Sequence, residues 1–451
     1  MANSSVKVRP LLADAPLSAF QIAVVALCVL INICDGLDTT ATAYAAPAIL
    51  KDWRLAPQTM GLILSAGAAG LMLGAILIAP LADRFGRRPI VLAAATTSAV
   101  AMIAISASTN WETLLLFRFL AGLAIGALVP SLSVIVVEFS NETRGNFFLA
   151  CVHIGFAIGA MIGAAIGAAL LGAHGWRSIY LVAGLITGAV AVAAFVLLPE
   201  SLHFLLNRQP ANALARANAI LRRLKQPELA ALPPVPERPS RSPLAIGAIL
   251  SGPLRSATLF LWLASFMRYF VSYFLTSWKP QVLVLAGFKG QAAVAVGMAT
   301  SFAAILGVLA IGTLAARLGS RRATAGALLL CAVGLMGFAW VSSPVTLILF
   351  AMLSMFSIEA AFTGMLITSN RLYPDHARST GVGLAVGMGR VGAIAGPYAG
   401  GVLIGLGLDK SAYYPLYAVA ALIGAGAILL ARARGQETAD DRVARQLSGA
   451  R

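Results

Sequence analysis

Two aspartates, Asp35 and Asp38, stand three residues apart in an apolar stretch near the start of the chain. In a helix this spacing places both carboxyl groups on one face. Two like charges at this distance do not both ionise easily, so the pair is expected to share one proton. Asp35 and Asp38 are therefore a candidate proton-coupling site, and Glu359, in a later apolar run, is a third candidate acid.

Few other ionisable side chains lie inside the apolar runs, and each needs a partner or a wet cavity because an isolated charge is costly in hydrocarbon. Arg390 is a candidate for binding a substrate carboxylate directly. The alternative is a pair with Glu359, since both residues fall near the middle of their runs when the helical rise is counted from opposite sides. His153 is a candidate proton relay or substrate contact, or else a hydrogen-bonded packing residue.

The composition of the chain excludes a soluble globule. Of 451 residues, 59% are hydrophobic and only 11% are charged, which leaves too little polar surface to face water. The apolar residues form about twelve runs, each near the ~20 residues that a helix needs to cross the hydrocarbon. We therefore predict an all-α membrane protein with twelve transmembrane helices. The runs lie at roughly 17–30, 59–78, 89–108, 113–137, 147–171, 178–198, 256–278, 291–315, 323–341, 345–369, 379–406 and 413–431.

Basic residues predict the orientation of these helices. Clusters such as Arg84, Arg87 and Arg88 recur at alternate connections, whereas the other connections carry few, among them Lys279 and Lys410. The positive-inside rule then places both termini in the cytoplasm of a multi-pass inner-membrane protein. The formal charge of +16 is accordingly interpreted as a topology signal, and the expected partner is the lipid bilayer rather than nucleic acid.

Landmarks in the first part of the chain recur in the second at a nearly constant offset. Leu81-Ala82-Asp83-Arg84-Phe85-Gly86-Arg87-Arg88 matches Leu314-Ala315-Ala316-Arg317-Leu318-Gly319-Ser320-Arg321-Arg322, with Ala316 in place of Asp83. Arg144 matches Arg378, and Gly155 matches Gly392. Such an offset predicts duplication. The expected domains are two six-helix halves, 1–198 and 255–434, a cytoplasmic linker, 199–254, and a cytoplasmic tail, 435–451.

The first copy of this motif resembles the loop between helices two and three of the major facilitator superfamily, with Ala79 where the pattern has its first glycine. The resemblance spans the whole chain. It implies a twelve-helix transporter in which helices one, four, seven and ten line a central cavity that opens to alternate sides of the membrane.

The same loop is a candidate conformational latch. Asp83, at the cytoplasmic end of helix two, can accept hydrogen bonds from an arginine or from the N-terminus of a neighbouring helix. The alternative is a basic loop that fixes topology and has no switching role. The residues assigned to the latch are Asp83, Arg84, Arg87, Arg88, Glu138 and Arg144.

Asp35-Gly36-Leu37-Asp38 resembles the Asp-Gly-x-Asp signature of the aromatic acid/proton symporter family. Leu372-Tyr373-Pro374 and the glycine-rich segment 383–392 resemble that family's pattern for helices ten and eleven. The resemblance implies proton-driven uptake of an aromatic carboxylate such as a benzoate or hydroxybenzoate, with both aspartates essential. Because helices one and four line the superfamily's cavity, Arg118 is expected near these aspartates. Competition of substrate anion, aspartate and proton for this cation would couple the two fluxes.

An aromatic anion also needs flat walls for its ring. Tyr269 and Tyr273 are spaced to share one face of the predicted seventh helix, which makes them candidate substrate contacts. The alternative is that these rings face lipid or neighbouring helices.

Other functions remain open at this point, although an enzyme is not expected. The sequence has no metal-ligand spacing, nucleophile elbow or glycine-rich phosphate loop, so neither a metal nor a cofactor is predicted. The alternatives within transporters are a symporter for a non-aromatic acid, such as a dicarboxylate or muconate, and an efflux antiporter. Ile158-Gly159-Ala160 lacks the Gly-Pro pair of the superfamily's drug/proton antiporters, which disfavours the latter. The protein is expected to act as a monomer.

Overall fold

The structure is a computed structural model that describes residues 18–141, 144–234, 247, 249–252, 254–285, 287–288 and 290–432. Within these ranges the ordered elements are all helical, as the apolar runs predict. The predicted tail 435–451 and residues 235–246 of the predicted linker lie outside the described residues.

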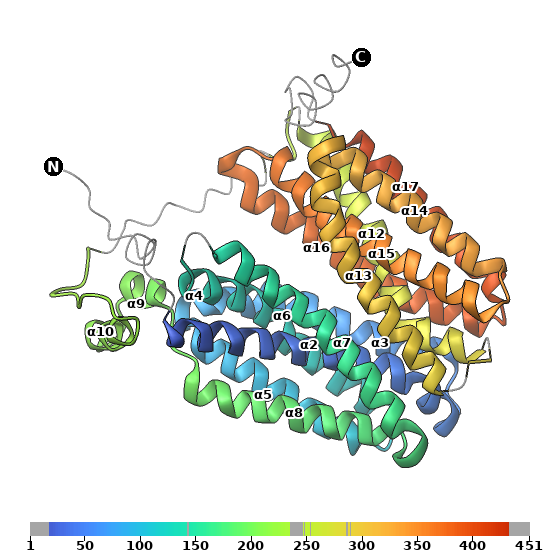
Figure 1. Cartoon of the computed structure of the whole chain (residues 1–451), viewed down its shortest axis with the longest axis horizontal. Coiled ribbons are helices and arrows are strands. Elements are labelled where there is room, and N and C mark those ends of the chain that lie inside the picture. The colour runs from blue at the N-terminus through green and yellow to red at the C-terminus, as the bar shows by residue number, and fades with distance from the viewer. Residues whose placement is uncertain are drawn as a thin grey trace. The chain divides into compact units, whose positions relative to one another are not determined.

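The first part of the chain forms long helices that end at turns or basic loops (Figure 1). Their bounds are α2 Ala19–Asp52, α3 Pro57–Leu73, α5 Arg87–Ser106, α6 Trp111–Glu138, α7 Gly145–His174 and α8 Trp176–Leu197. The helix that begins as α3 continues through a π turn, η1 (Gly74–Ile78), a 3-10 turn, η2 (Ala79–Leu81), and the short α4 (Ala82–Phe85). Two short helices then follow, α9 Leu202–Arg208 and α10 Ala213–Arg223.

The later part of the chain repeats the pattern of long helices (Figure 1). Their bounds are α12 Leu254–Leu285, α13 Gly290–Leu318, α14 Ser320–Trp340, α15 Pro344–Leu372, α16 Asp375–Gly405 and α17 Lys410–Leu430.

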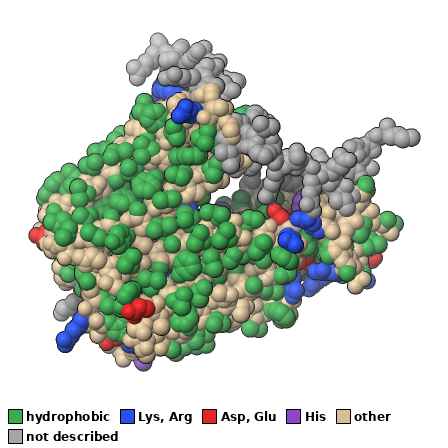
Figure 2. Space-filling model, turned by 180° about the vertical axis from the view of Figure 1, so that it is seen from behind, with side chains coloured by type: hydrophobic (Ala, Val, Ile, Leu, Met, Phe, Trp, Pro, Cys, Tyr) green, Lys and Arg blue, Asp and Glu red, His purple; other side chains and the backbone are tan. Residues whose placement is uncertain are grey.

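Eleven helices among the described residues are long and apolar enough to cross a membrane. The protein is therefore a multi-pass membrane protein, and Figure 2 shows hydrophobic side chains spread over much of the visible face. The twelfth predicted span corresponds to α16, which is a helix of sufficient length. Arg390 and many glycines lower its hydropathy. Twelve spans and cytoplasmic termini therefore stay predictions.

The chain divides into two compact units, and the boundaries at 41/42, 68/69, 163/164 and 176/177 fall inside helices. Unit 1 comprises Met1–Ala41, Ala69–Gly163 and Arg177–Ser240, and unit 2 comprises Thr42–Ala68, Ala164–Trp176 and Arg241–Arg451. Four helices, α2, α3, α7 and α8, therefore contribute residues to both units, α8 by its first residue, Trp176. The sequence halves 1–198 and 255–434 remain a prediction about duplication.

In unit 1, glycines let helices cross at very short distances. A Cβ at Gly36 would lie 2.0 Å from the carbonyl oxygen of Phe156, and one at Gly159 would lie 2.0 Å from that of Ile33. The backbones of α2 and α7 are therefore in contact, which only glycine permits. This crossing explains why a glycine follows Asp35.

In unit 2, α12 packs on α16 through the same device. A Cβ at Gly392 or Gly396 would lie 2.2 Å from the carbonyl oxygens of Phe266 and Phe270, respectively. On its α17 side, α12 stacks the ring of Phe274 on that of Tyr417, with centroids 3.7 Å apart. Both faces of α12 are thus fixed, which holds its polar side chains in defined positions.

Candidate functional site

Asp38 and Arg118 form a buried ion pair in unit 1. Arg118, from α6, donates from Nη1 to Oδ1 of Asp38, on α2, at 2.9 Å, and to its backbone carbonyl at 3.3 Å. The two residues are 1% and 6% exposed, so the pair is shielded from water. The buried Nε of Arg118 has no hydrogen-bond partner among the described residues. The expected proximity of Arg118 and Asp38 is present, and the guanidinium keeps a donor that Asp38 does not use.

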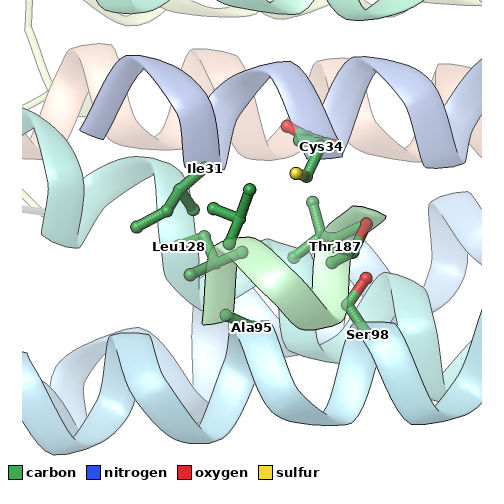
Figure 3. Close-up of a pocket in the computed structure, with 9 residues that line it drawn as sticks. Ile31, Cys34, Ala95, Ser98, Leu128 and Thr187 are labelled. Atoms are coloured by element: carbon green, nitrogen blue, oxygen red, sulfur yellow. The ribbon is translucent and has the colours of Figure 1, made fainter. Parts of the chain in front are cut away.

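Asp35 lies in different surroundings from Asp38. It lines a small pocket between α2, α5, α6 and α8, with room for about one water molecule. Figure 3 shows Cys34, Ser98 and Thr187 converging on this pocket from three helices. Asp38 therefore faces a guanidinium, whereas Asp35 lines a pocket together with hydroxyl-bearing and apolar side chains, and a proton shared between the two aspartates stays a prediction.

Unit 2 contains a second ion pair, in which the arginine is buried and the carboxylate is partly buried. Arg268, on α12, donates from Nη2 to Oε1 of Glu359, on α15, at 2.9 Å. Ser272 Oγ donates to the same oxygen at 3.2 Å, and Arg268 Nε donates to the carbonyl of Ile358 at 3.3 Å. The sequence suggested Arg390 as a partner for Glu359. Arg268, the partner found in the structure, was not predicted.

Aromatic rings surround the guanidinium of Arg268. Its Cζ lies 4.5 Å from the ring centroid of Phe362 and 4.8 Å from that of Tyr269. Tyr269 stacks on Tyr273 with centroids 6.0 Å apart, so both predicted tyrosines belong to this group. Phe274 and Trp278, further along α12, instead pack toward α17 and α16. The structure thus separates the rings beside the cation from those that hold the helices together.

Arg390 and His153 are less buried than Asp38, Arg118 and Arg268. Arg390 is half-buried on α16, close enough to Tyr269 for an electrostatic interaction, and Gly389 beside it packs on the Tyr269 ring. His153 is exposed on α7, with no hydrogen bond among the described residues. The roles considered for His153 therefore stay predictions.

The predicted latch residues meet at Arg87 rather than at Asp83. Arg87 Nη1 donates to Glu138 Oε1 at 3.0 Å, and Nη2 donates to Asp83 Oδ1 at 3.3 Å. The side chains of Arg87 and Glu138 are each 10% exposed, whereas that of Asp83 is 57% exposed. Because exposure weakens an ion pair, Glu138 is the stronger partner.

Two residues that were not assigned to the latch from the sequence complete this network, Glu200 and Ser201. Glu200 Oε1 accepts from the backbone amides of Arg87 and Arg88 at 2.9 and 3.1 Å, at the N-terminus of α5. Ser201 Oγ donates to Glu138 Oε1 at 2.8 Å and accepts from Arg87 Nη1 at 2.9 Å. The sequence does place Glu200 just after the sixth predicted span, where an acidic side chain can accept from the N-terminus of a neighbouring helix.

The other three arginines assigned to the latch have different contacts. Arg88 donates to the carbonyls of Leu198 and Phe195 at 2.8 and 2.6 Å, which ties α5 to the end of α8. Arg84 is exposed, with its Cζ 5.3 Å from the Phe85 ring centroid. Arg144 is exposed, and its backbone amide donates to Asn141 Oδ1 at 3.0 Å. The side chains of Arg84 and Arg144 thus lie outside the Arg87 network.

Substitution of Arg87 is expected to destabilise the fold far more than substitution of Asp83. Arg87→Gln leaves the buried Glu138 carboxylate without a cation, which costs about 3–5 kcal/mol of unfolding free energy. Asp83→Asn removes a largely exposed pair, which costs about 1 kcal/mol or less. Thermal unfolding of the purified variants measures both effects, and equal losses would contradict this assignment.

Comparison with known proteins agrees with these observations. The family model described as Major Facilitator Superfamily matches residues 28–357 and 299–448. The 4-hydroxybenzoate transporter PcaK of Pseudomonas aeruginosa is 32% identical over 92% of this chain and 93% of its own. The gallate transporter of Pseudomonas putida is 30% identical over 95% of each chain.

A solved structure has the same fold. A bacterial homolog of the human lysosomal transporter Spinster, crystallised inward-facing and unoccupied, gives a TM-score of 0.65 at 15% identity. The match covers 92% of this chain and 95% of that one. Together with the family model and the curated relatives, this shows that the chain belongs to the Major Facilitator Superfamily, within the group that includes these aromatic acid transporters.

Proposed function

We propose that this protein is a monomeric inner-membrane symporter that imports a small aromatic carboxylate with protons by alternating access. The observation that carries the proposal is two arginine–carboxylate contacts inside the apolar helices: Arg118–Asp38, which is buried, and Arg268–Glu359, whose buried arginine lies beside aromatic rings. Buried charges of this kind mark ion and substrate pathways in membrane proteins. Relatives named for hydroxylated benzoates support the substrate class.

Proton coupling follows from competition for Arg118. When Asp38 is ionised, its carboxylate occupies Nη1 of Arg118. When Asp38 takes up a proton, the attraction falls, and the guanidinium becomes available to the substrate carboxylate. Arginine binds carboxylates best through two parallel N–H groups, and Nε is already without a partner among the described residues. One proton bound thus allows one anion to bind.

Asp35 is proposed as the second acid of this system. Its pocket has room for about one water molecule and presents the hydroxyls of Ser98 and Thr187. A water molecule there would hydrogen-bond the protonated or the ionised carboxyl group. Asp35 can therefore accept and release a proton without breaking the ion pair of Asp38.

The rings beside Arg268 are proposed to select an aromatic anion. Tyr269, Tyr273 and Phe362 offer faces and edges against which a benzoate ring can stack. Glu359 is the acid in this group and is 24% exposed at its side chain, which leaves it open to protonation. Arg390, close to Tyr269, and His153 remain proposed further contacts of the substrate.

A binding competition on the purified protein tests the substrate class. With radiolabelled 4-hydroxybenzoate bound, we expect unlabelled benzoate and gallate to displace the label. Benzamide is the matched control, because it keeps the ring and lacks the charge. We expect it to compete at least about tenfold more weakly, the effect of losing one charge-assisted hydrogen bond. Displacement by muconate or succinate alone would favour the non-aromatic alternative, and specific binding of lipophilic cations would favour an efflux antiporter.

A further inference from the structure

Lys279 is a buried cation with one polar partner among the described residues. The topology predicted from the sequence places it in a connection, but α12 continues past it to Leu285. The residue is only 9% exposed, and its Nζ donates to Thr300 Oγ1, on α13, at 2.6 Å. The Thr300 hydroxyl in turn donates to the carbonyl of Gly297 at 2.9 Å, so its oxygen is the acceptor for Lys279. Within the described part of the chain, no carboxylate lies within ion-pair distance of Nζ.

Lys410 shows what a structural lysine looks like in the same unit. Its Nζ donates to three carbonyls, those of Phe338, Ala339 and Val341, at 2.9, 3.2 and 2.6 Å. These carbonyls lie at the end of α14, so Lys410 caps that helix with all three of its donors. Lys279 uses one donor and has two left. A buried ammonium with spare donors and no counter-ion is costly, and packing alone gives no reason to keep it.

Lys279 lies on the same stripe of α12 as Arg268. Positions 268, 272, 275 and 279 follow the four- and three-residue steps that place side chains on one helix face. Eleven residues of rise separate the two cations, about 16 Å along the helix axis. The stripe thus carries a neutralised cation, Arg268 with Glu359, and a cation without a described counter-ion, Lys279.

An aromatic side chain lies beside the turn of α13 that holds Lys279 through Thr300. A Cβ at Gly297 would lie 1.9 Å from the hydroxyl oxygen of Tyr44, so this tyrosine packs directly on the turn of α13 that carries Thr300. Tyr44, Gly297, Thr300 and Lys279 all belong to unit 2. A cation, two hydroxyl groups and a ring are the components that recognise an aromatic carboxylate.

We propose that Lys279 is a second binding station for the carboxylate group of the transported acid, separate from the group around Arg268. The two spare donors of Nζ hold the carboxylate oxygens, and Thr300 keeps the ammonium in place. The anion then exchanges between two cations on one face of α12. This inference rests on the proposed function, because it requires the substrate to be a carboxylate.

Transport kinetics of Lys279 variants test the station. In proteoliposomes, Lys279→Met and Lys279→Gln are expected to raise the KM for 4-hydroxybenzoate about tenfold or more, the size expected for losing a hydrogen bond to a charged group. The saturated rate should change far less. Lys279→Arg keeps the charge and should keep most of the affinity. Lys410→Met is the matched control, with a lower unfolding temperature and an unchanged KM.

The two neutral variants guard against a folding defect, since glutamine can still donate to Thr300 and methionine preserves the packing. If both fold and both leave the KM unchanged while the wild-type protein transports aromatic acids, the station is overturned and the proposed function stands. The station is also overturned if Lys279→Arg raises the KM as much as Lys279→Met, because charge is then not what matters. If the wild-type protein transports no aromatic acid, the proposed function itself fails, and the station with it.

Discussion

Asp38→Asn is expected to abolish accumulation of substrate driven by a pH gradient while leaving exchange of substrate for substrate. Asparagine keeps an oxygen that accepts from Arg118 Nη1, so the hydrogen bond is retained. The buried guanidinium loses its counter-ion, which lowers the stability, and thermal unfolding checks that the variant is folded before transport is measured. Asparagine cannot bind and release a proton, so anion binding at Arg118 no longer depends on protons. Loading unlabelled substrate inside proteoliposomes and adding label outside measures exchange, and an imposed inward proton gradient measures accumulation.

The control for this variant is Glu112→Gln, which removes an exposed carboxylate from the first turn of the helix that carries Arg118. It should accumulate substrate as the wild-type protein does. Full gradient-driven accumulation by Asp38→Asn would remove Asp38 from the coupling mechanism. Loss of both exchange and accumulation in a folded variant would show that Asp38 serves substrate binding rather than coupling.

Loss of Arg268 is expected to have the second large effect. Arg268→Met leaves the Glu359 carboxylate with Ser272 as its hydrogen-bond donor, and because the Glu359 side chain is 24% exposed this costs less than the about 3–5 kcal/mol of a fully buried pair. It also removes the cation from the rings of Tyr269 and Phe362. We expect both stability and transport to fall. Adding Glu359→Gln should recover much of the stability, because removing a whole buried pair is often nearly neutral.

Transport should not recover in that double variant, and this difference separates function from structure. The matched control is the exposed pair Arg222–Glu228, 3.5 Å apart, with side chains 67% and 51% exposed. Neutralising it should cost about 1 kcal/mol or less and leave transport unchanged. If the Arg268→Met, Glu359→Gln double variant regained both stability and transport, the pair would be a packing element only.

The sequence predicted the unit 1 site better than the unit 2 site, for a physical reason. Asp35, Asp38 and Arg118 are isolated charges in strongly apolar runs, and helical spacing or family resemblance links them. In unit 2, the sequence offered Arg390 as a partner for Glu359, whereas the structure pairs Glu359 with Arg268, and which arginine it meets depends on the rotation of α12 and α16. That rotation is fixed by glycine contacts such as that of Gly392 with Phe266, which no single-sequence pattern reveals.

The ends of helices also differ between the sequence prediction and the structure. Pro280 directly follows Lys279 and suggests the end of a helix, yet α12 continues to Leu285. A lysine expected at a connection is therefore buried. In the loop before α5, the motif led us to predict that Asp83 is the central latch residue. In the structure Asp83 is exposed, and the buried Arg87 makes the ion pairs with Asp83 and Glu138. Burial, which decides the strength of an ion pair, is a tertiary property that sequence position does not give.

Gradient-driven uptake by the wild-type protein is the most direct test of the central claim. Proteoliposomes are given radiolabelled 4-hydroxybenzoate with an inward gradient of one pH unit, and protein-free liposomes measure passive entry of the neutral acid. Above that background, we expect accumulation that approaches about tenfold if one proton accompanies each anion, and that disappears with a proton ionophore. Uptake that only equilibrates the label and ignores the gradient would contradict proton symport, and no uptake above protein-free liposomes would contradict aromatic acid transport.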